Sequence, residues 1–487
     1  MTEPALTAQF KRALADMLAR QIAGFKGLLD YEQLTAGASQ ETYRIRLEDG
    51  AGERLLALRR SPPSLDTGSV VGSISLETEA RLFQLAAAAG IPGPQVHYVL
   101  RAEDDLGRGF VMDWLEGETL GQRILRDERL ADIRPQLARD CGKILGHIHA
   151  LDWESAGLSG DLRQLSPAQL VQETWASYRD LGVPVPMIDY SYRWLTAHAP
   201  RTFRRTLVHG DFRNGNLMVT PTGINAVLDW ELAYIGDPVR DLGWICVNSW
   251  RFGNDELAVG GFGAIEDLLA GYRETSGVQV SLDELKYWQV FGSFWWAMAT
   301  LQMANAWRSG DTPSLERPVI GRRSSEAQMD CVNLLIPGAF SLPDIHAAPG
   351  DGTQLPMPAE LLTAVVAYLK DEVATQLTGR SAFLARVAAN SLGIAQREFQ
   401  CGEALADREQ ARLQNLLGPE FLQQLDPSKQ HPQKQDPLDA LRWALVHRLR
   451  DDMPLDTPGL AEHLRQTVAG QLAIDQPRYP ALRYSQP

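Results

Sequence analysis

Three polar residues in the stretch LVHGDFRNGNLMVTPTGINAVLDW (residues 207–230) could combine proton abstraction with metal binding. Asp211 is a candidate general base, because a carboxylate can accept the proton of an attacking hydroxyl. Asn216 lies five residues later, and Asp229 lies eighteen residues after Asp211. Their amide and carboxylate oxygens are ligands that Mg²⁺ favours, and such a site leaves coordination positions for phosphates. The stretch therefore predicts a base next to a magnesium site.

A β-hairpin is expected to bring these residues together. Thr220-Pro221-Thr222-Gly223 is a turn signal, with Pro at its second place, between the apolar runs 217–219 and 226–228. The first strand begins just after Asn216 and the second ends just before Asp229. Antiparallel pairing therefore predicts that the two oxygen ligands lie at the same end of the hairpin.

This arrangement resembles the catalytic centre of the protein-kinase fold. With His-Gly-Asp in place of His-Arg-Asp, and Asp-Trp-Glu in place of Asp-Phe-Gly, it is similar to the aminoglycoside phosphotransferase and choline kinase-like superfamily. The resemblance covers roughly residues 30–340 and implies ATP- and Mg²⁺-dependent phosphate transfer to a hydroxyl of a small molecule. The alternative is three polar loop residues that cap turns.

Residues 34–43, LTAGASQETY, resemble the family's phosphate loop, in which Gly37 and Ser39 would approach the nucleotide phosphates. Relatives commonly have two glycines and an Asn where this chain has Ala36-Gly37 and Gln40. An ordinary hairpin is therefore the alternative for this stretch.

Three other parts of the nucleotide site follow from the resemblance. Arg59, in LALRR, falls where kinases keep the lysine that pairs with the phosphates, and Glu79 is its expected ion-pair partner. Simple surface charge is the alternative for Glu79. Met112 and Asp113 fall at the hinge whose backbone holds adenine, with a plain core strand as the alternative.

Several other residues have both functional and structural interpretations. Asp241 matches the family aspartate that braces the catalytic loop, although a first-turn acid could simply complement the helix dipole. His209 is expected to pack beside that loop, and His147 and His149 are expected to be core or helix-end residues. A basic group could neutralise a phosphorylated substrate or lie on the surface; it comprises Arg317, Arg322 and Arg323.

The chain as a whole predicts an α+β protein-kinase-like fold of two lobes, followed by an all-α helical bundle. Short strands around one helix predict a sheet-rich N-lobe over residues 1–117, and helical periodicity predicts a mostly helical C-lobe over 118–336. A Pro/Gly-rich linker is expected at 337–358, and amphipathic helices at 359–487.

The helical insert at about 245–335 looks most like the branch of the superfamily associated with acyl-CoA dehydrogenases. That branch implies a hydroxyacyl-CoA acceptor; an aminoglycoside acceptor and a nucleotide-binding pseudokinase scaffold are the alternatives. The C-terminal helices resemble a helical domain of unknown function that accompanies some phosphotransferases of this branch. They are expected to dock on the kinase lobe, to support self-association or to bind a protein partner; a passive stabilising appendage is the alternative.

Composition bounds the remaining choices. The chain has 487 residues, 44% hydrophobic and 22% charged, which are ordinary values for a globular protein. Its net charge of -14 disfavours nucleic acid and anionic membranes as partners. Four scattered cysteines and no export signal indicate a reducing, cytoplasmic setting. The aromatic-rich segment 287–307 is expected to be a buried helix, not a membrane span.

Overall fold

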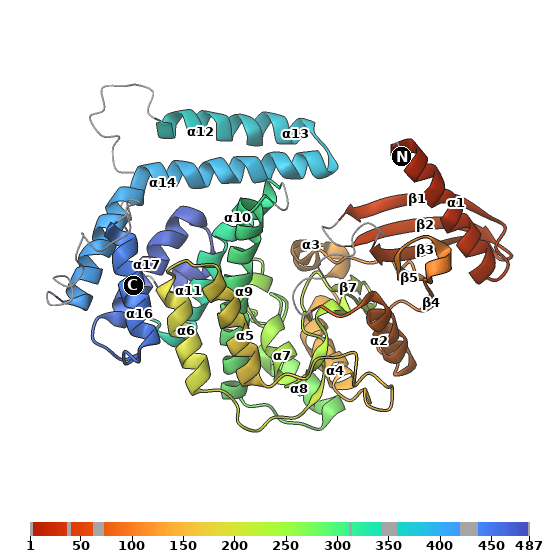
Figure 1. The fold of residues 1–487 in the computed structure, drawn as a ribbon, viewed down its shortest axis with the longest axis horizontal. Helices are drawn as coiled ribbons and strands as arrows, with labels where there is room; N and C mark the ends of the chain where they lie inside the picture. The colour runs from red at the N-terminus through yellow and green to blue at the C-terminus, as the bar shows by residue number, and fades with distance from the viewer. Residues whose placement is uncertain are drawn as a thin grey trace. The chain divides into compact units, whose positions relative to one another are not determined.

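The computed structural model describes residues 3–36, 40–61, 73–310, 314–342, 358–418 and 437–485 (Figure 1). The contacts within the chain define two compact units, each built from separate segments. Unit 1 contains residues 1–166, 202–246 and 250–285, and unit 2 contains residues 167–201, 247–249 and 286–487.

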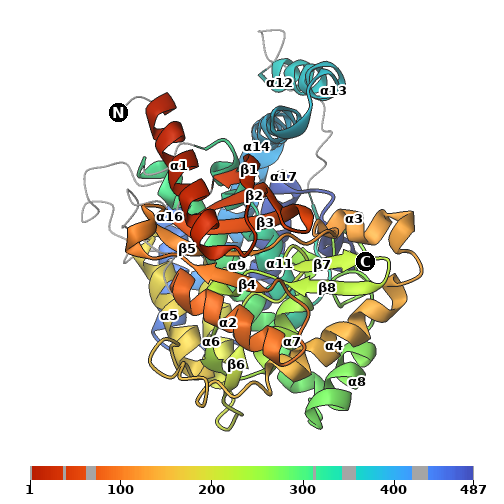
Figure 2. The same ribbon diagram turned by 90° about the vertical axis from the view of Figure 1, so that its right-hand side faces the viewer.

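Unit 1 begins with a helix and an antiparallel five-stranded sheet of order β1-β2-β3-β5-β4. These elements are α1 (Glu3–Gln21), β1 (Gly27–Ala36), β2 (Glu41–Asp49), β3 (Gly52–Ser61), β4 (Val96–Val99) and β5 (Arg108–Asp113). In β2 every second residue is buried, as the two-residue period of a strand requires when one face is covered. Met17 of α1 shares a core with Ile45 and Leu58, so α1 covers that face (Figure 2).

The opposite face of the sheet carries helix α2 (Leu76–Ala88). Ser75 caps this helix by accepting a hydrogen bond from the Thr78 amide at 3.1 Å. Phe83 of α2 packs on Phe110 of β5, with ring centroids 5.9 Å apart. Because side chains alternate along β3, Arg59 points away from the face that holds Leu58 and toward α2.

The rest of unit 1 is mostly helical and carries two small two-stranded sheets. Its main elements are α3 (Gly121–Arg126), α4 (Leu137–Ile148), β6 (Thr206–Val208), β7 (Leu217–Thr220), β8 (Gly223–Val227), β9 (Tyr234–Gly236), α7 (Val239–Ile245) and α8 (Ile265–Ser276). Helices α4 and α8 approach so closely that a Cβ at Gly142 would lie 2.0 Å from the Leu268 carbonyl oxygen. The predicted order of a sheet-rich part followed by a helical part is confirmed.

Unit 2 is helical. Its main helices are α5 (Pro167–Asp180), α6 (Pro186–Ala197), α9 (Leu282–Arg308, whose first residues belong to unit 1), α10 (Glu316–Arg322), α11 (Ser324–Leu335), α12 (Pro358–Tyr368), α13 (Ala374–Gln376), α14 (Gly379–Leu417), α16 (Pro437–Arg450) and α17 (Leu460–Asp475). Trp288, Phe291 and Phe294 of α9 are buried, which confirms a core helix in this aromatic-rich segment. Within the described ranges, the structure contains no helix long and apolar enough to cross a membrane.

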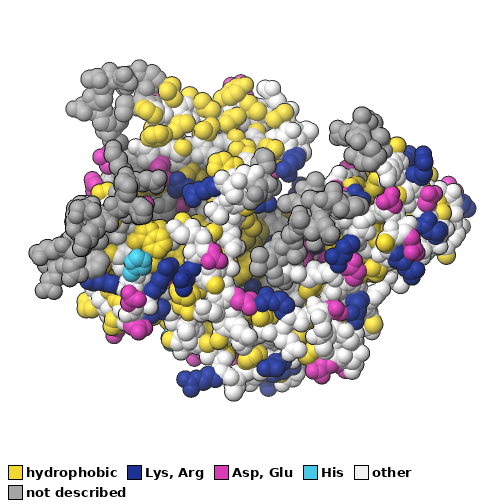
Figure 3. Space-filling model, viewed as in Figure 1, with side chains coloured by type: hydrophobic (Ala, Val, Ile, Leu, Met, Phe, Trp, Pro, Cys, Tyr) yellow, Lys and Arg dark blue, Asp and Glu magenta, His cyan; other side chains and the backbone are white. Residues whose placement is uncertain are grey.

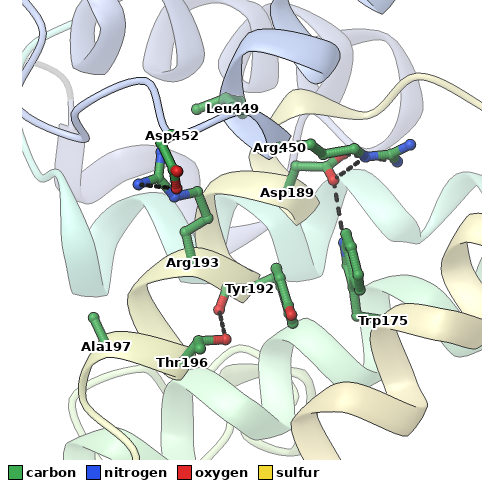
Figure 4. Close-up of a pocket in the computed structure, with 9 residues that line it drawn as sticks. All are labelled: Trp175, Asp189, Tyr192, Arg193, Thr196, Ala197, Leu449, Arg450 and Asp452. Atoms are coloured by element: carbon green, nitrogen blue, oxygen red, sulfur yellow. Dashed lines mark hydrogen bonds and ion pairs between the residues drawn. The ribbon is translucent and has the colours of Figure 1, made fainter.

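The C-terminal helices share unit 2 with helices from the middle of the chain. Figure 4 shows a cavity of about 390 Å³ where α16 lies against α5 and α6. There, Asp189 of α6 accepts a hydrogen bond from Arg450 of α16 at 2.8 Å and one from Trp175 of α5 at 3.2 Å. The linker expected at 337–358 lies largely outside the described residues, and the expected domain boundaries stay a prediction.

The basic group predicted near residue 320 is tied into unit 2, whose surface is drawn by residue type in Figure 3. Arg322 bonds the carboxylates of Asp475 and Glu398 at 3.1 and 2.9 Å, and Arg323 bonds Glu326 at 3.0 Å. These ion pairs give Arg322 and Arg323 structural partners.

Candidate active site

The hairpin predicted from the sequence is present. Strands β7 and β8 pair antiparallel, with Leu217 opposite Val227 and a turn between Thr220 and Gly223. Beyond the strands, the Leu228 amide donates a hydrogen bond to the Asn216 carbonyl at 2.8 Å. This bond places Asn216 next to the residue that precedes Asp229, so the two candidate metal ligands lie at one end of the hairpin.

Three side chains hold the carboxylate of Asp211. The indole Nε1 of Trp244 and the Nε of Arg213 donate to its Oδ1 at 2.7 and 3.0 Å. The amide Nδ2 of Asn216 donates to its Oδ2 at 2.6 Å. The Asp211 side chain is 14% exposed, and Oδ2 retains a lone pair that can accept a hydroxyl proton. The geometry thus suits an oriented general base.

The backbone of the catalytic loop is fixed by Asp241, as the family resemblance implies. The two carboxylate oxygens of Asp241 accept hydrogen bonds from the His209 and Gly210 amides at 2.8 and 2.9 Å. Gly210 adopts φ +82°, and a Cβ there would lie 2.3 Å from the Leu232 carbonyl oxygen. Only glycine fits this position, which explains why the loop has Gly directly before Asp211.

Two buried histidines support the loop as packing residues. His209 accepts a bond from the Asp211 amide at Nδ1 and lies 3.0 Å from the Leu228 carbonyl through Nε2, which requires a neutral ring. Burial lowers the pKa of His209, consistent with that state. The ring of His149 lies 3.1 Å from Asp241 and 3.1 Å from the hydroxyl of Tyr272. His149 is therefore a core residue that orients the bracing aspartate.

Arg59 lies among three carboxylates. It bonds Glu79 at 3.1 Å, Asp229 at 2.5 Å and Glu231 at 3.5 Å. Burial lowers the pKa of Arg59, but these carboxylates more than offset that effect and raise it above its ordinary value. Burial raises the pKa of Glu79 to about 7, although Arg59 opposes the shift. The predicted Arg59–Glu79 ion pair is present.

Asp229 adopts a backbone conformation that non-glycine residues rarely take, with φ 64° and ψ 63°. Such strain is typical of functional positions. Burial and the negative charge of the neighbouring Asp229 raise the pKa of Glu231, because carboxylates that lie together at this end of the hairpin repel one another. A cation or a further arginine contact would relieve the repulsion.

The donor set fits Mg²⁺ in part. Because Nδ2 of Asn216 bonds Asp211, its Oδ1 is the atom left to coordinate a cation, together with the carboxylate of Asp229. Among the described residues there is no group of three or more His, Cys, Asp or Glu side chains placed to hold a metal. Mg²⁺ bound here would therefore take most of its ligands from phosphates and water, as it commonly does.

The other predicted nucleotide contacts are only partly described. Gly37 and Ser39 lie outside the described residues. Met112 pairs with Ala57 across the sheet, and the Asp113 amide donates to the Gln95 carbonyl. The side chain of Asp113 bonds His97 at 2.6 Å. Both residues thus lie in paired strand structure, and their assignment to an adenine hinge stays a prediction.

Two residues that contact Asp211 were missed from the sequence. Arg213 lies two residues after Asp211 and stacks over the ring of Trp250, 4.4 Å from its centroid. Trp244 lies three residues after Asp241 on α7, so one helix face carries both the loop brace and a donor to the base. The sequence signals were the Asp-x-Arg spacing of Asp211 and Arg213, and the (i, i+3) spacing of Asp241 and Trp244.

A sheet-rich part with an Arg59–Glu79 pair, followed by a hairpin with Asp211, Asn216 and Asp229 at one end, is the arrangement expected of a kinase-like phosphotransferase. Residues 30–278, slightly more than half of the chain, match the phosphotransferase enzyme family, and the chain belongs to this family. Residues 375–479 match a domain of unknown function (DUF6285). The resemblance inferred from the sequence is confirmed for both parts.

Curated relatives match more than half of the chain. Mouse acyl-CoA dehydrogenase family member 10 is 29% identical over 295 residues, covering 57% of this chain and 26% of the relative. Chicken acyl-CoA dehydrogenase family member 11 is 26% identical over 312 residues, covering 58% of this chain and 38% of the relative. The chain thus spans between a quarter and two fifths of the length of these relatives.

A solved structure shows the same fold. The protein is from Ralstonia eutropha JMP134 and is provisionally assigned as an aminoglycoside phosphotransferase. It is 22% identical, with a TM-score of 0.54, and the match covers 66% of this chain and 96% of that one. The kinase-like fold predicted from the sequence is confirmed.

Proposed function

We propose that the protein transfers a phosphate from ATP, with Mg²⁺, to a hydroxyl group of a small molecule. The observation that carries this proposal is the carboxylate of Asp211, fixed by three donors at the end of the hairpin that holds Asn216 and Asp229. Phosphoryl transfer of this kind depends mainly on positioning and charge neutralisation, so a prearranged set of oxygens and cations is what the reaction needs.

Each side chain then has a role. Asp211 accepts the proton of the acceptor hydroxyl, and Asn216 keeps the Asp211 carboxylate oriented while offering Oδ1 to the metal. Asp229 would hold Mg²⁺, and Arg59, which bonds Asp229 in this structure, would contact the nucleotide phosphates. Mg²⁺, when bound, supplies a Lewis acid that offsets charge on the phosphates. Gly37 and Ser39 are proposed to contact the same phosphates.

A hydroxyacyl-CoA is the acceptor that we propose. The relatives matched by this chain are named as acyl-CoA dehydrogenase family members, and residues 30–278 of the chain match the phosphotransferase enzyme family. The net charge of -14 supports an aminoglycoside as the alternative, because an acidic protein attracts a polycation. The presence of Asp211, Asn216 and Asp229 together argues against a pseudokinase.

The test compares ATP consumption with a 3-hydroxyacyl-CoA, the same free hydroxy acid and kanamycin, each with and without Mg²⁺. We expect Mg²⁺-dependent turnover with the CoA ester, and a matched Asp229→Ala variant that stays inactive at any acceptor concentration. Transfer to kanamycin alone would replace the acceptor proposal. ATP binding without transfer to any of these acceptors, or full activity of Asp229→Ala, would contradict the catalytic proposal.

A further inference from the structure

A second cavity in unit 2 has a feature that the cavity in Figure 4 lacks. It measures about 250 Å³ and lies among α6, α9, α10, α11, α14, α16 and α17. One of its lining residues is His463 of α17, which is only 2% exposed. Neither ring nitrogen of His463 has a hydrogen-bond partner among the residues that the structure describes. In the Figure 4 cavity, by contrast, the carboxylate of Asp189 is bonded to Trp175 and Arg450.

The imidazole of His463 is neutral. Burial and the positive charges of Arg412 and Arg442 lower the pKa of His463 to about 3. A neutral imidazole offers one donor and one acceptor nitrogen, and which nitrogen carries the proton can change. A buried ring of this kind without partners is unusual, because buried polar groups are normally hydrogen-bonded. A polar group inside the cavity would therefore satisfy the hydrogen-bonding capacity of the ring.

The charged residues that line the cavity are already paired with one another. Arg442 bonds Glu409 through two contacts of 2.8 and 2.7 Å, and Arg322 bonds Asp475 at 3.1 Å. Two cations and two carboxylates thus leave no net charge in the lining. The carboxylates would repel an anionic ligand, and the guanidinium groups would repel a cationic one. A charged ligand of either sign therefore finds no unpaired group of opposite charge in the lining.

The remaining walls are mixed. Apolar side chains line one part of the cavity: Val185, Pro186, Met187, Leu301, Leu464 and Val468. Ser324, Gln328 and Thr467 add neutral polar groups. The volume is far larger than one water molecule needs, and a water has no favourable contact with the apolar walls. A ligand with an apolar body and a neutral polar group would contact the apolar walls and form hydrogen bonds with the polar ones.

We propose that this cavity binds a small uncharged molecule that carries a hydroxyl or carboxamide on a short apolar body, with His463 as its hydrogen-bond partner. The lining comes from both family segments: Pro186 lies in the phosphotransferase match, and His463 lies in the domain of unknown function. The proposal gives that domain a ligand-binding role and does not depend on the proposed catalysis.

The test uses four probes of similar size: butyramide, 1-butanol, butyrate and butylammonium. The full-length protein is labelled with ¹³C at histidine Cε1, and the His463 signal is assigned by its loss in His463→Gln. We expect butyramide or 1-butanol to shift this signal saturably, with half-saturation on the order of millimolar for so few atoms. Butyrate and butylammonium should bind at least about tenfold more weakly.

Controls distinguish binding in the cavity from general effects. The exposed His447 of α16 should not shift with any probe. Val468→Phe should abolish the His463 shift, because the larger ring fills the apolar end while the imidazole remains. If His463→Gln fails to fold, Val468→Phe also serves to assign the His463 signal. The signal that shifts with a probe in the unaltered protein but not in Val468→Phe is then the signal of His463. Equal binding of butyrate or butylammonium, or no shift with any probe, would overturn the proposal.

Discussion

Asp211 in unit 1 and Asp189 in unit 2 have nearly the same set of donors. Asp211 accepts bonds from Trp244, Arg213 and Asn216. Asp189 accepts bonds from the indole of Trp175 at 3.2 Å, from Arg450 at 2.8 Å and from the hydroxyl of Tyr178 at 3.1 Å. The Asp211 side chain is 14% exposed, whereas that of Asp189 is 1% exposed.

The difference shows that the identity of its donors does not decide whether a carboxylate is accessible to a substrate. Asp211 stands on a loop whose backbone is held by Asp241, so its position is fixed while one oxygen stays accessible. Asp189 stands inside helix α6 and is enclosed by α5 and α16. The first arrangement leaves an acceptor for a substrate, and the second uses the carboxylate to join helices.

The largest expected effect is on transfer by Asp211→Asn. Loss of the base should lower kcat by about 10²–10⁴-fold, while nucleotide binding and thermal stability stay near those of the unaltered protein. Steady-state kinetics and a nucleotide titration measure the two properties. Near-normal turnover of Asp211→Asn would remove this residue from the role of base.

The same substitution in unit 2, Asp189→Asn, should act on stability instead. Removing one partner of a buried ion pair leaves Arg450 without its counterion and costs about 3 kcal/mol. Calorimetry of the full chain should show a lower transition temperature for unit 2, with kcat nearly unchanged. If kcat falls in parallel with that of Asp211→Asn, the contrast between the two aspartates is wrong.

Gly210→Ala tests whether the position of Asp211 depends on its backbone. The added Cβ would collide with the Leu232 carbonyl oxygen, so the loop must shift. We expect kcat to fall by about 10- to 100-fold, because small displacements of reacting groups are costly. Gly160→Ala is the matched control, since a Cβ there meets nothing within 4 Å. Equal loss in both variants would point to a general effect on folding.

Trp244→Phe and Trp175→Phe form a matched pair. Each removes one indole donor, from Asp211 and Asp189 respectively. We expect about a tenfold loss of kcat in Trp244→Phe, because the Asp211 carboxylate is held less firmly, and none in Trp175→Phe. Steady-state kinetics of both variants measure the difference. An unchanged kcat in Trp244→Phe would limit Trp244 to packing.

The last expected effect appears only on acidification and concerns His463 in unit 2. Its pKa is about 3 in the folded protein and about 6.5 when unfolded, so the unfolded chain binds more protons between these values. The free energy of unfolding should therefore fall as the pH drops from 6.5 toward 3, by at most about 1.4 kcal/mol per pH unit from this group. His463→Leu should lose this slope. Acid sensitivity equal to that of the unaltered protein would assign the effect to other groups.

The local part of the site could be predicted from the sequence. Asp211, Asn216 and the turn at Thr220 lie within one short stretch, so spacing and turn chemistry were enough to predict the hairpin. The ion pair of Arg59 with Glu79 followed from the family resemblance. Asn216 and Asp229 were placed at one hairpin end by register alone.

Contacts between distant segments could not be predicted. Trp244 reaches Asp211 across 33 residues, and no local pattern shows which indole will point toward the loop. A Pro/Gly-rich composition, as at residues 337–358, predicts a linker, but it carries no information on whether α16 will pack against α6.

The pairing of Asp189 with Arg450 also sets an order for folding during synthesis. The two residues are 261 positions apart, whereas the last residue of unit 1 is Leu285. At about 5–20 residues per second, a ribosome needs roughly 13 to 50 s to go from one partner to the other. Every segment of unit 1 is thus synthesised before Arg450, the counterion of Asp189. A ribosome-stalled chain ending near residue 330 would capture this stage, with α6 still lacking the helix that completes its core.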